Sequence, residues 1–178
     1  MNVSLMAKAA LIAALTAATA IVAIPIGSVP VTLQVFFVLL AGLVLGPVYG
    51  ALSMVVYILL GIVGLPVFAG GTAGIGVLVG PRGGYLFGFI LAAIVVGAIG
   101  LGSRGESSIW RPAVAMGAGI VAIYVPGVAQ LALVTGMSLT QAALAGAAPF
   151  IIFDVIKAVA ATAVARKVGL ADGKSTHR

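Results

Sequence analysis

An aspartate and a lysine lie three residues apart in the apolar segment PFIIFDVIKAVAA, which begins at Pro149. On a helix this spacing places Asp154 and Lys157 on one face, where both can contact the same group. Each charge costs about 2.5–3.5 kcal/mol at the centre of a membrane-spanning helix, so such residues commonly have a function. The carboxylate accepts N–H hydrogen bonds and the ammonium donates to a carbonyl oxygen. The pair therefore suits a neutral urea-like or amide ligand.

Two other roles of this pair remain open. In the first, Asp154 and Lys157 form a structural ion pair and only neutralise each other. In the second, Asp154 relays protons, although the sequence offers no second buried acid to pass a proton onward.

The composition requires the elements around this pair to lie in a membrane. Of 178 residues, 63% are hydrophobic and 7% are charged, whereas a soluble domain carries about a quarter charged residues. We therefore expect one all-α integral membrane domain over residues 1–178. The net charge of +6 does not favour nucleic acid as a partner, because the basic residues lie between apolar segments and form no stripe. The absence of cysteine excludes disulfides and thiol chemistry.

Turn residues divide the apolar sequence into six predicted transmembrane helices. They cover approximately residues 5–26, 33–45, 51–64, 85–101, 113–134 and 149–165. The first resembles a signal peptide, but its 22 residues are enough to cross a bilayer, and we interpret it as a retained helix.

The basic residues decide whether the second and third helices are separate. One helix from Leu33 to Gly64 would be about 48 Å long and two would each be short, so length does not decide. With six helices and a cytoplasmic N-terminus, only Arg82 lies outside, as the positive-inside rule favours. The basic residues inside are then Lys8, Arg104, Arg111, Arg166, Lys167, Lys174 and Arg178. We therefore predict a multi-pass protein with both termini in the cytoplasm.

The predicted extracellular loop from Gly64 to Gly84 holds eight glycines among apolar residues. Glycine lets backbone N–H groups approach a ligand closely, and flexible linkers are polar rather than apolar. We expect this loop to fold back over the helices as a lid or re-entrant plug. The loop contains neither the dinucleotide fingerprint G-x-G-x-x-G nor a phosphate-loop ending G-K-[ST].

Several single polar residues are weaker candidates for contacts to a ligand. Arg82 either neutralises a ligand carboxylate or extends to lipid headgroups. Tyr85 is an interfacial anchor first and a ligand contact second. Gln34, Gln130 and Tyr124 are possible polar liners of a site, although helix packing is the preferred role of each.

Small residues repeat every four positions in the first helix. Ala9, Ala13 and Ala17 form one row, and Ala10 and Ala14 belong to a parallel row. This spacing allows two helices to approach closely, either within the chain or with a partner protein.

Two segments together resemble the BioY family, the biotin-specific substrate-binding (S) components of energy-coupling factor (ECF) transporters. These segments are GLPVFAGGTAGIGVLVGPRGGYLFGF and PFIIFDVIKAVAA. The resemblance implies high-affinity binding and uptake of biotin at a bacterial or archaeal cell membrane. It also implies a transmembrane T component and two cytoplasmic ATPases as partners, which bind the ATP. It implies no enzymatic activity, no cofactor and no metal.

The resemblance also implies roles for individual residues. Asp154 and Lys157 match the family's contacts to the ureido ring of biotin, and the small-residue face of the first helix matches the surface that docks the T component. The residues that match the loop over the ligand are Gly70, Gly71, Thr72, Ala73, Gly74, Gly83, Gly84 and Tyr85. Arg82 stands where similar proteins often have a small polar residue, so its contact to the valerate carboxylate is a separate hypothesis.

Three alternatives differ in function. In the first, the chain is an S component for another vitamin. In the second, it carries biotin without partner proteins, and Asp154 couples uptake to protons. An intramembrane enzyme is the third, but it needs a nucleophile and a base, and the single histidine, His177, lies in the polar tail.

Overall fold

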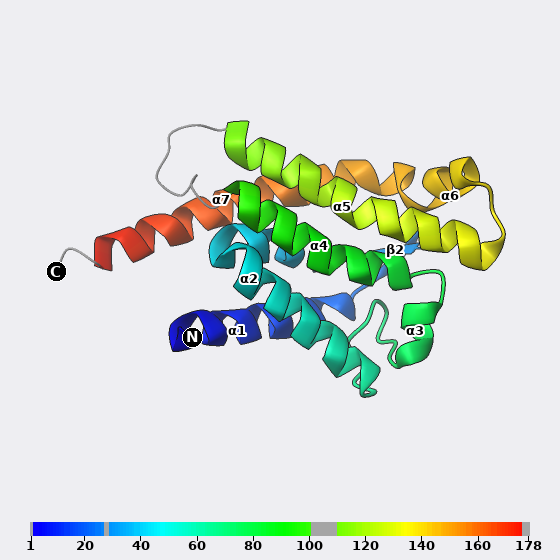
Figure 1. Cartoon of the computed structure of the whole chain (residues 1–178), viewed down its shortest axis with the longest axis horizontal. Coiled ribbons are helices and arrows are strands. Elements are labelled where there is room, and N and C mark those ends of the chain that lie inside the picture. The colour runs from blue at the N-terminus through cyan, green and yellow to red at the C-terminus, as the bar shows by residue number, and fades with distance from the viewer. Residues whose placement is uncertain (1, 27–28, 101–109, 176–178) are drawn as a thin grey trace.

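Long apolar helices make up most of the computed structural model, which describes residues 2–26, 29–100 and 110–175 (Figure 1). The long helices are α1 (Val3–Ala20), α2 (Gln34–Ile62), α4 (Gly83–Gly100), α5 (Trp110–Thr135) and α7 (Ile151–Ser175). The short elements are β1 (Ile24–Ile26), β2 (Val29–Val31), α3 (Ile75–Val79), α6 (Leu139–Gly146) and a 3₁₀ turn at Ala148–Phe150. Among the described residues, five segments are long and apolar enough to cross a membrane. The prediction of a multi-pass helical membrane protein is confirmed.

Helix α2 reverses direction in its middle and forms two antiparallel arms. Gly46 has φ 79° and ψ −178°, which breaks the helix just before Pro47. The amide of Gln34 donates to the hydroxyl of Tyr57, although these residues would lie about 35 Å apart along one straight helix. The two arms correspond to the predicted second and third helices. In the part of the chain that the structure describes, six helical segments therefore cross the bundle, as the distribution of basic residues predicts.

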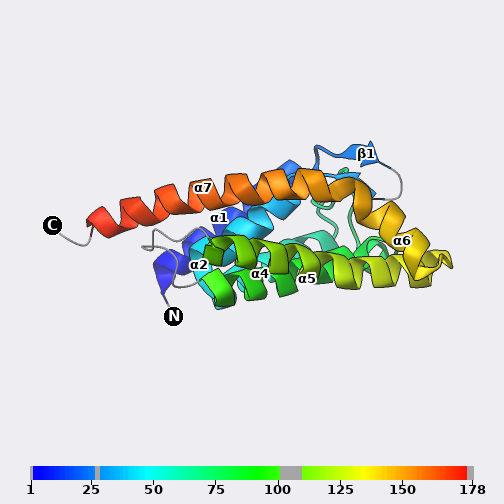
Figure 2. The ribbon, with the colours of Figure 1, turned by 90° about the horizontal axis from the view of Figure 1, so that it is seen from above.

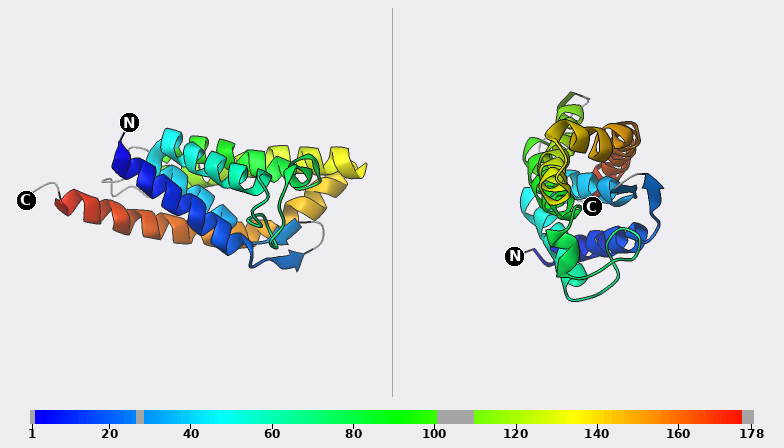
Figure 3. Two further views of the ribbon diagram at one scale, coloured as in Figure 1. Left: turned by 90° about the horizontal axis from the view of Figure 1, so that it is seen from below. Right: turned by 90° about the vertical axis from the view of Figure 1, so that its right-hand side faces the viewer.

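The reversal of α2 is buried against α4. A Cβ added at Gly97 would lie 2.3 Å from the backbone nitrogen of Pro47, so the α4 backbone touches the turn. The α2 arms pack on α4, α4 packs on α5, and α1 and α7 cover α2 from outside (Figures 2 and 3). This arrangement places α2 and α4 at the centre of the bundle.

The two ends of the bundle differ in charge. Both chain ends, the end of α4 and the start of α5 lie at one end of the molecule, and α3, α6 and the β1–β2 ribbon lie at the other (Figure 1). Lys8 near the start of α1, Arg111 at the start of α5, and Arg166 and Lys167 in α7 belong to the first end. Arg82, just before α4, belongs to the second. Arg104 and Arg178 lie outside the described residues, and the side chain of Lys174 is not described either.

The structure differs from the predicted helix limits at several points. Helix α1 ends at Ala20 rather than Ile26, because the chain enters an antiparallel ribbon in which Pro25 pairs with Pro30. The last helix begins at Ile151 and continues to Ser175, beyond the predicted residues 149–165. Helix α6, which sequence analysis did not predict, precedes it and begins with a capping box between Ser138 and Gln141.

Candidate binding site

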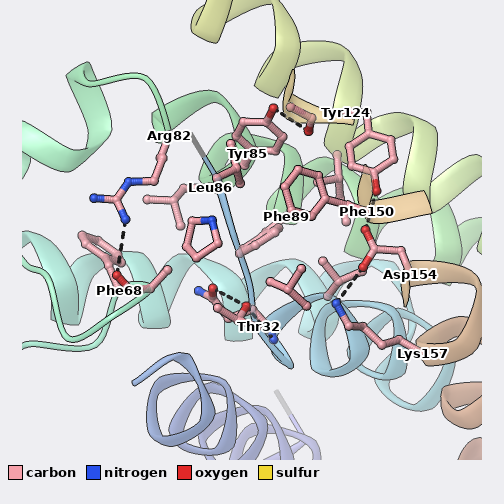
Figure 4. Close-up of a pocket in the computed structure, with 18 of the residues that line it drawn as sticks. Thr32, Phe68, Arg82, Tyr85, Leu86, Phe89, Tyr124, Phe150, Asp154 and Lys157 are labelled. Carbon is pink, nitrogen blue, oxygen red and sulfur yellow. Dashed lines mark hydrogen bonds and ion pairs between the residues drawn. The ribbon is translucent and has the colours of Figure 1, made fainter. Parts of the chain in front are cut away.

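A cavity lies where the ribbon, the glycine-rich loop and the helices meet (Figure 4). Its lining residues are Val29, Pro30, Val31, Thr32, Gln34, Val35, Phe68, Ala69, Val77, Arg82, Tyr85, Leu86, Phe89, Ile123, Tyr124, Gly146, Phe150, Asp154 and Lys157. Most of the wall is apolar, and the polar side chains are few and separate. A cavity with this lining suits a ligand that is mainly hydrophobic and carries polar groups at defined positions.

Asp154 and Lys157 form a buried ion pair in the cavity wall. The Lys157 ammonium donates to Asp154 Oδ1 at 2.8 Å, and Asp154 is 3% exposed. The Tyr124 hydroxyl donates to the other carboxylate oxygen, Oδ2, at 2.5 Å. Both carboxylate oxygens therefore have a donor, from α5 on one side and from α7 on the other. The carboxylate accepts about four hydrogen bonds and the ammonium donates three, so the pair keeps capacity for a ligand.

A second polar cluster connects the ribbon, α2 and the loop. The Thr32 hydroxyl donates to Gln34 Oε1 at 2.7 Å, and Gln34 Nε2 donates to the Tyr57 hydroxyl. The Tyr57 hydroxyl then donates to the carbonyl oxygen of Val67 at 3.0 Å. This chain of bonds ties both arms of α2 to the start of the loop. One N–H of the Gln34 amide is left over for the cavity, which Gln34 lines.

Arg82 lies on the opposite side of the cavity from the ion pair. Figure 4 shows Arg82 beside Phe68, with Asp154, Lys157 and Tyr124 across the cavity. Arg82 Nη1 donates to the carbonyl oxygen of Ala69 at 3.4 Å, which is a long hydrogen bond. The cavity thus has a neutralised ion pair at one side, a cation at the other and apolar walls between them.

The glycine-rich loop folds back onto the helices, as its apolar residues predict. Phe68 is 1% exposed and packs edge-to-face on Tyr57, with ring centroids 5.7 Å apart. The backbone N–H of Gly70 donates to the carbonyl oxygen of Ala20 at 2.9 Å, and the backbone N–H of Gly74 donates to the carbonyl oxygen of Gly61 at 2.7 Å. The loop is therefore fastened to the ends of α1 and α2.

The predicted loop residues do not all face the cavity. Residues 70–74 are absent from its lining, and the loop contributes Phe68, Ala69 and Val77 instead. Gly83 and Gly84 are packing positions, since an added Cβ would meet backbone carbonyls of neighbouring segments at 1.7 and 2.1 Å. Tyr85 does line the cavity, and its hydroxyl donates to Gly146 at 2.8 Å.

The three amide and phenol candidates have different positions. Gln34 and Tyr124 line the cavity, whereas Gln130 does not. Gln130 Nε2 donates to the carbonyl oxygens of Leu78 and Gly80, at 2.7 and 2.8 Å. Gln130 therefore holds the loop segment that leads into α4.

The two alanine rows of α1 differ in burial. Ala9, Ala13 and Ala17 are 3%, 1% and 8% exposed and belong to the core that α1 forms with α2. Ala10 and Ala14 are exposed on the outer face. Only the second row is accessible to a partner.

The aromatic and aliphatic walls of the cavity have no distinct signal in the sequence. Phe89 and Phe150 line it, but their sequence spacing is that of ordinary helix core. The ribbon residues Val29–Val31 fall between the predicted helices 5–26 and 33–45. The two prolines in IPIGSVPV are the signal against a helix there, and they fit a short edge ribbon.

Comparison with known proteins identifies close relatives. The model of the BioY family matches residues 1–172 of the chain. The biotin transporter BioY of Thermotoga maritima is 47% identical over 161 residues, 90% of this chain and 93% of the relative. The probable biotin transporter BioY of Pyrococcus horikoshii is 42% identical, over 89% of this chain and 92% of that relative. The crystal structure of the S-component for biotin from an ECF-type ABC transporter is similar with a TM-score of 0.86 at 26% identity, covering 93% of this chain and 90% of that one.

Proposed function

The chain belongs to the BioY family, and from this membership we propose that it binds biotin and takes it up as the S component of an ECF-type transporter. The observation that carries the proposal is a buried ion pair, Asp154 and Lys157, in the wall of a mainly apolar cavity. Biotin has a neutral ureido ring at one end, a carboxylate at the other and hydrocarbon between them. The cavity offers a partner for each part.

The ureido ring would bind at the ion pair. Asp154 accepts hydrogen bonds from Lys157 and Tyr124, and its remaining lone pairs can accept the ring N–H groups. Lys157 has two N–H donors beyond the one used for Asp154, and either can reach a ureido oxygen. A neutral ligand leaves the pair's charge balance intact, which matters inside a membrane.

The hydrocarbon part and the carboxylate would bind along the rest of the cavity. Phe89, Ile123 and Phe150 supply apolar contacts to the sulfur-containing ring and the aliphatic chain. The guanidinium of Arg82, on the side opposite the ion pair, would then neutralise the carboxylate. Its hydrogen bond to the carbonyl oxygen of Ala69, at 3.4 Å, is weak enough to exchange for a carboxylate.

The loop would act as the cover of the site. The cavity measures about 70 Å³, below the roughly 300–1,000 Å³ of pockets that hold drug-sized ligands. Biotin therefore needs part of the site to move outward. The segment from Gly70 through Gly71, Thr72 and Ala73 to Gly74 follows the lining residues Phe68 and Ala69 and has no bulky buried side chain, so it is the part that would move. In this proposal the cover and its hinge are formed by residues 70–74 together with Gly83, Gly84 and Tyr85. Among these loop residues, mainly Tyr85 contacts the ligand.

The partners would be a transmembrane T component and two cytoplasmic ATPases. The exposed row at Ala10 and Ala14 offers a small-residue face to a partner helix. The end of the bundle with Lys8, Arg111 and Arg166 would lie in the cytoplasm, in agreement with the positive-inside rule. The site would then open to the exterior of the cell membrane.

A binding titration tests the proposal. The purified full chain in detergent should give saturable heat with biotin and none with thiamine or riboflavin. If only another vitamin gives a binding heat, the chain has a different substrate. If a folded preparation gives no binding heat with any of the three, vitamin binding is refuted. Biotin uptake by cells that lack a T component and its ATPases would instead support a stand-alone carrier.

A further inference from the structure

A second hollow lies on the outer surface of the bundle between α5 and α7, and it shares no lining residue with the cavity described above. Its volume is about 420 Å³, within the roughly 300–1,000 Å³ range of pockets that hold drug-sized ligands. Its lining residues are Ala113, Met116, Gly117, Ile120, Val155, Ala158, Val159, Thr162, Ala163 and Arg166. We refer to these ten residues as the α5–α7 groove.

The groove exists because its two helices pack on different neighbours. Helix α5 packs on α4, and α7 packs mainly on α2, so their facing surfaces stay apart over the half of the bundle that holds the chain ends. Met116 and Ala158 are buried and form the floor. Beside Gly117 an added Cβ would meet no atom within 4 Å. The space beside Gly117 is therefore open.

The length of the groove offers only apolar contacts. The one hydroxyl, on Thr162, donates to the carbonyl oxygen of Ala158 at 2.9 Å and is thereby satisfied within the helix. The other walls are aliphatic side chains, methionine and glycine. The part of a ligand that lies along the groove is therefore hydrocarbon.

One end of the groove is positively charged. Arg166 lines it there, and Lys167 follows directly in the chain. This end lies at the basic end of the bundle, near the start of α5 at Trp110, a residue type that prefers the membrane interface. The cation therefore lies at the depth of lipid headgroups, while the apolar walls run toward the membrane centre.

We propose that the α5–α7 groove binds an anionic phospholipid, with an acyl chain along its apolar walls and the headgroup phosphate at Arg166. Basic pockets between transmembrane helices on the cytoplasmic side are suited to anionic headgroups, since phosphate oxygens accept from the guanidinium fork. The charge at the groove end selects an amphiphile over an apolar helix. This inference does not depend on which substrate the other cavity binds.

Native mass spectrometry of the full chain, after exchange into mixed phosphatidylglycerol and phosphatidylcholine, tests the proposal. The wild type should retain phosphatidylglycerol over phosphatidylcholine by about fivefold, the effect of one cationic side chain near a phosphate. Arg166→Gln should abolish this preference. Lys167→Gln, which removes the same charge from a residue outside the groove lining, should keep most of it.

A second pair of variants tests the apolar part. Gly117→Leu fills the groove and should reduce the retention of both lipids at least threefold, whereas Ala160→Leu, an exposed position outside the lining, should not. Gel-filtration profile and far-UV circular dichroism verify that each variant folds. Equal retention in Arg166→Gln and Lys167→Gln, or unchanged retention in Gly117→Leu, would refute the lipid site. Loss of a co-purified protein or a changed oligomeric state in Gly117→Leu would also refute it, because the occupant would then be a polypeptide.

Discussion

Two polar clusters flank the same cavity, and they use their hydrogen bonds differently. The cluster of Asp154, Lys157 and Tyr124 contains a carboxylate and an ammonium group, and it keeps hydrogen-bond donors and acceptors free for a ligand. In the cluster of Thr32, Gln34 and Tyr57, every polar hydrogen but one is bonded within the protein.

The difference indicates a division of labour. A charged pair inside a membrane costs several kcal/mol, which is unnecessary if the only role is to join helices. Neutral side chains join the ribbon, α2 and the loop in the second cluster without that cost. The first cluster is therefore suited to bind the ligand, and the second to hold the walls of the site in place.

The largest expected effect is in the first cluster. Asp154→Asn should weaken biotin binding at least about tenfold, the 1.4 kcal/mol scale of one charge-assisted hydrogen bond, measured by calorimetric titration. Thr162→Val, which removes a satisfied hydroxyl from the same helix, is the control and should bind biotin normally. Unchanged affinity in Asp154→Asn would leave Asp154 and Lys157 as a structural pair only.

Arg82→Ala should have the second largest effect, about fivefold on biotin affinity, because the proposed partner of the carboxylate, Arg82, is partly exposed whereas Asp154 is buried. With biotinamide, which carries no carboxylate, Arg82→Ala should cause no loss of affinity. A loss for biotin greater than that of Asp154→Asn would mean that the carboxylate, and not the ring, anchors the ligand.

Tyr124→Phe should weaken biotin binding about threefold, since Asp154 then loses the donor that orients one carboxylate oxygen. Tyr49→Phe serves as a control, because the Tyr49 hydroxyl contacts Asn2 at the other end of the bundle. If both variants bind biotin equally well, Tyr124 packs in the wall without positioning Asp154.

Tyr57→Phe in the second cluster should change biotin affinity less than twofold. It should lower the free energy of unfolding by about 1 kcal/mol, because it removes the hydrogen-bond donor to the Val67 carbonyl oxygen and the acceptor for the Gln34 amide. Thermal unfolding in detergent and a biotin titration measure the two effects. A tenfold loss of affinity with unchanged stability would contradict the division between the clusters.

Sequence patterns sufficed for the architecture where one strong physical rule applied. The scarcity of charge required a membrane, and the basic residues required a reversal between the second and third helices, which the structure has at Gly46. The pairing of Asp154 with Lys157 follows from helical spacing alone. These features depend on local composition or on positions three residues apart.

Features that depend on long-range contacts were beyond the sequence. Tyr124 reaches Asp154 across 30 positions, and no local pattern encodes that contact. Gly83 and Gly84 resemble the other loop glycines in sequence, yet neighbouring backbone occupies the space beside them. Likewise, spacing makes the two alanine rows equivalent, and only packing against α2 shows that Ala13 is inside and Ala14 outside.

The reversal of α2 at Gly46 has a consequence for the surrounding lipid. The arms from Gln34 and from Pro47 are about 18 and 24 Å long, both shorter than a hydrocarbon layer of about 30 Å. The bend between them packs closely against α4 at Gly97, three residues before α4 ends at Gly100. Where the second arm reaches the surface of the bundle, at Val48 and Leu59, it is hydrophobically mismatched to an average bilayer. Lipids beside these residues must shorten their span or the protein must lean.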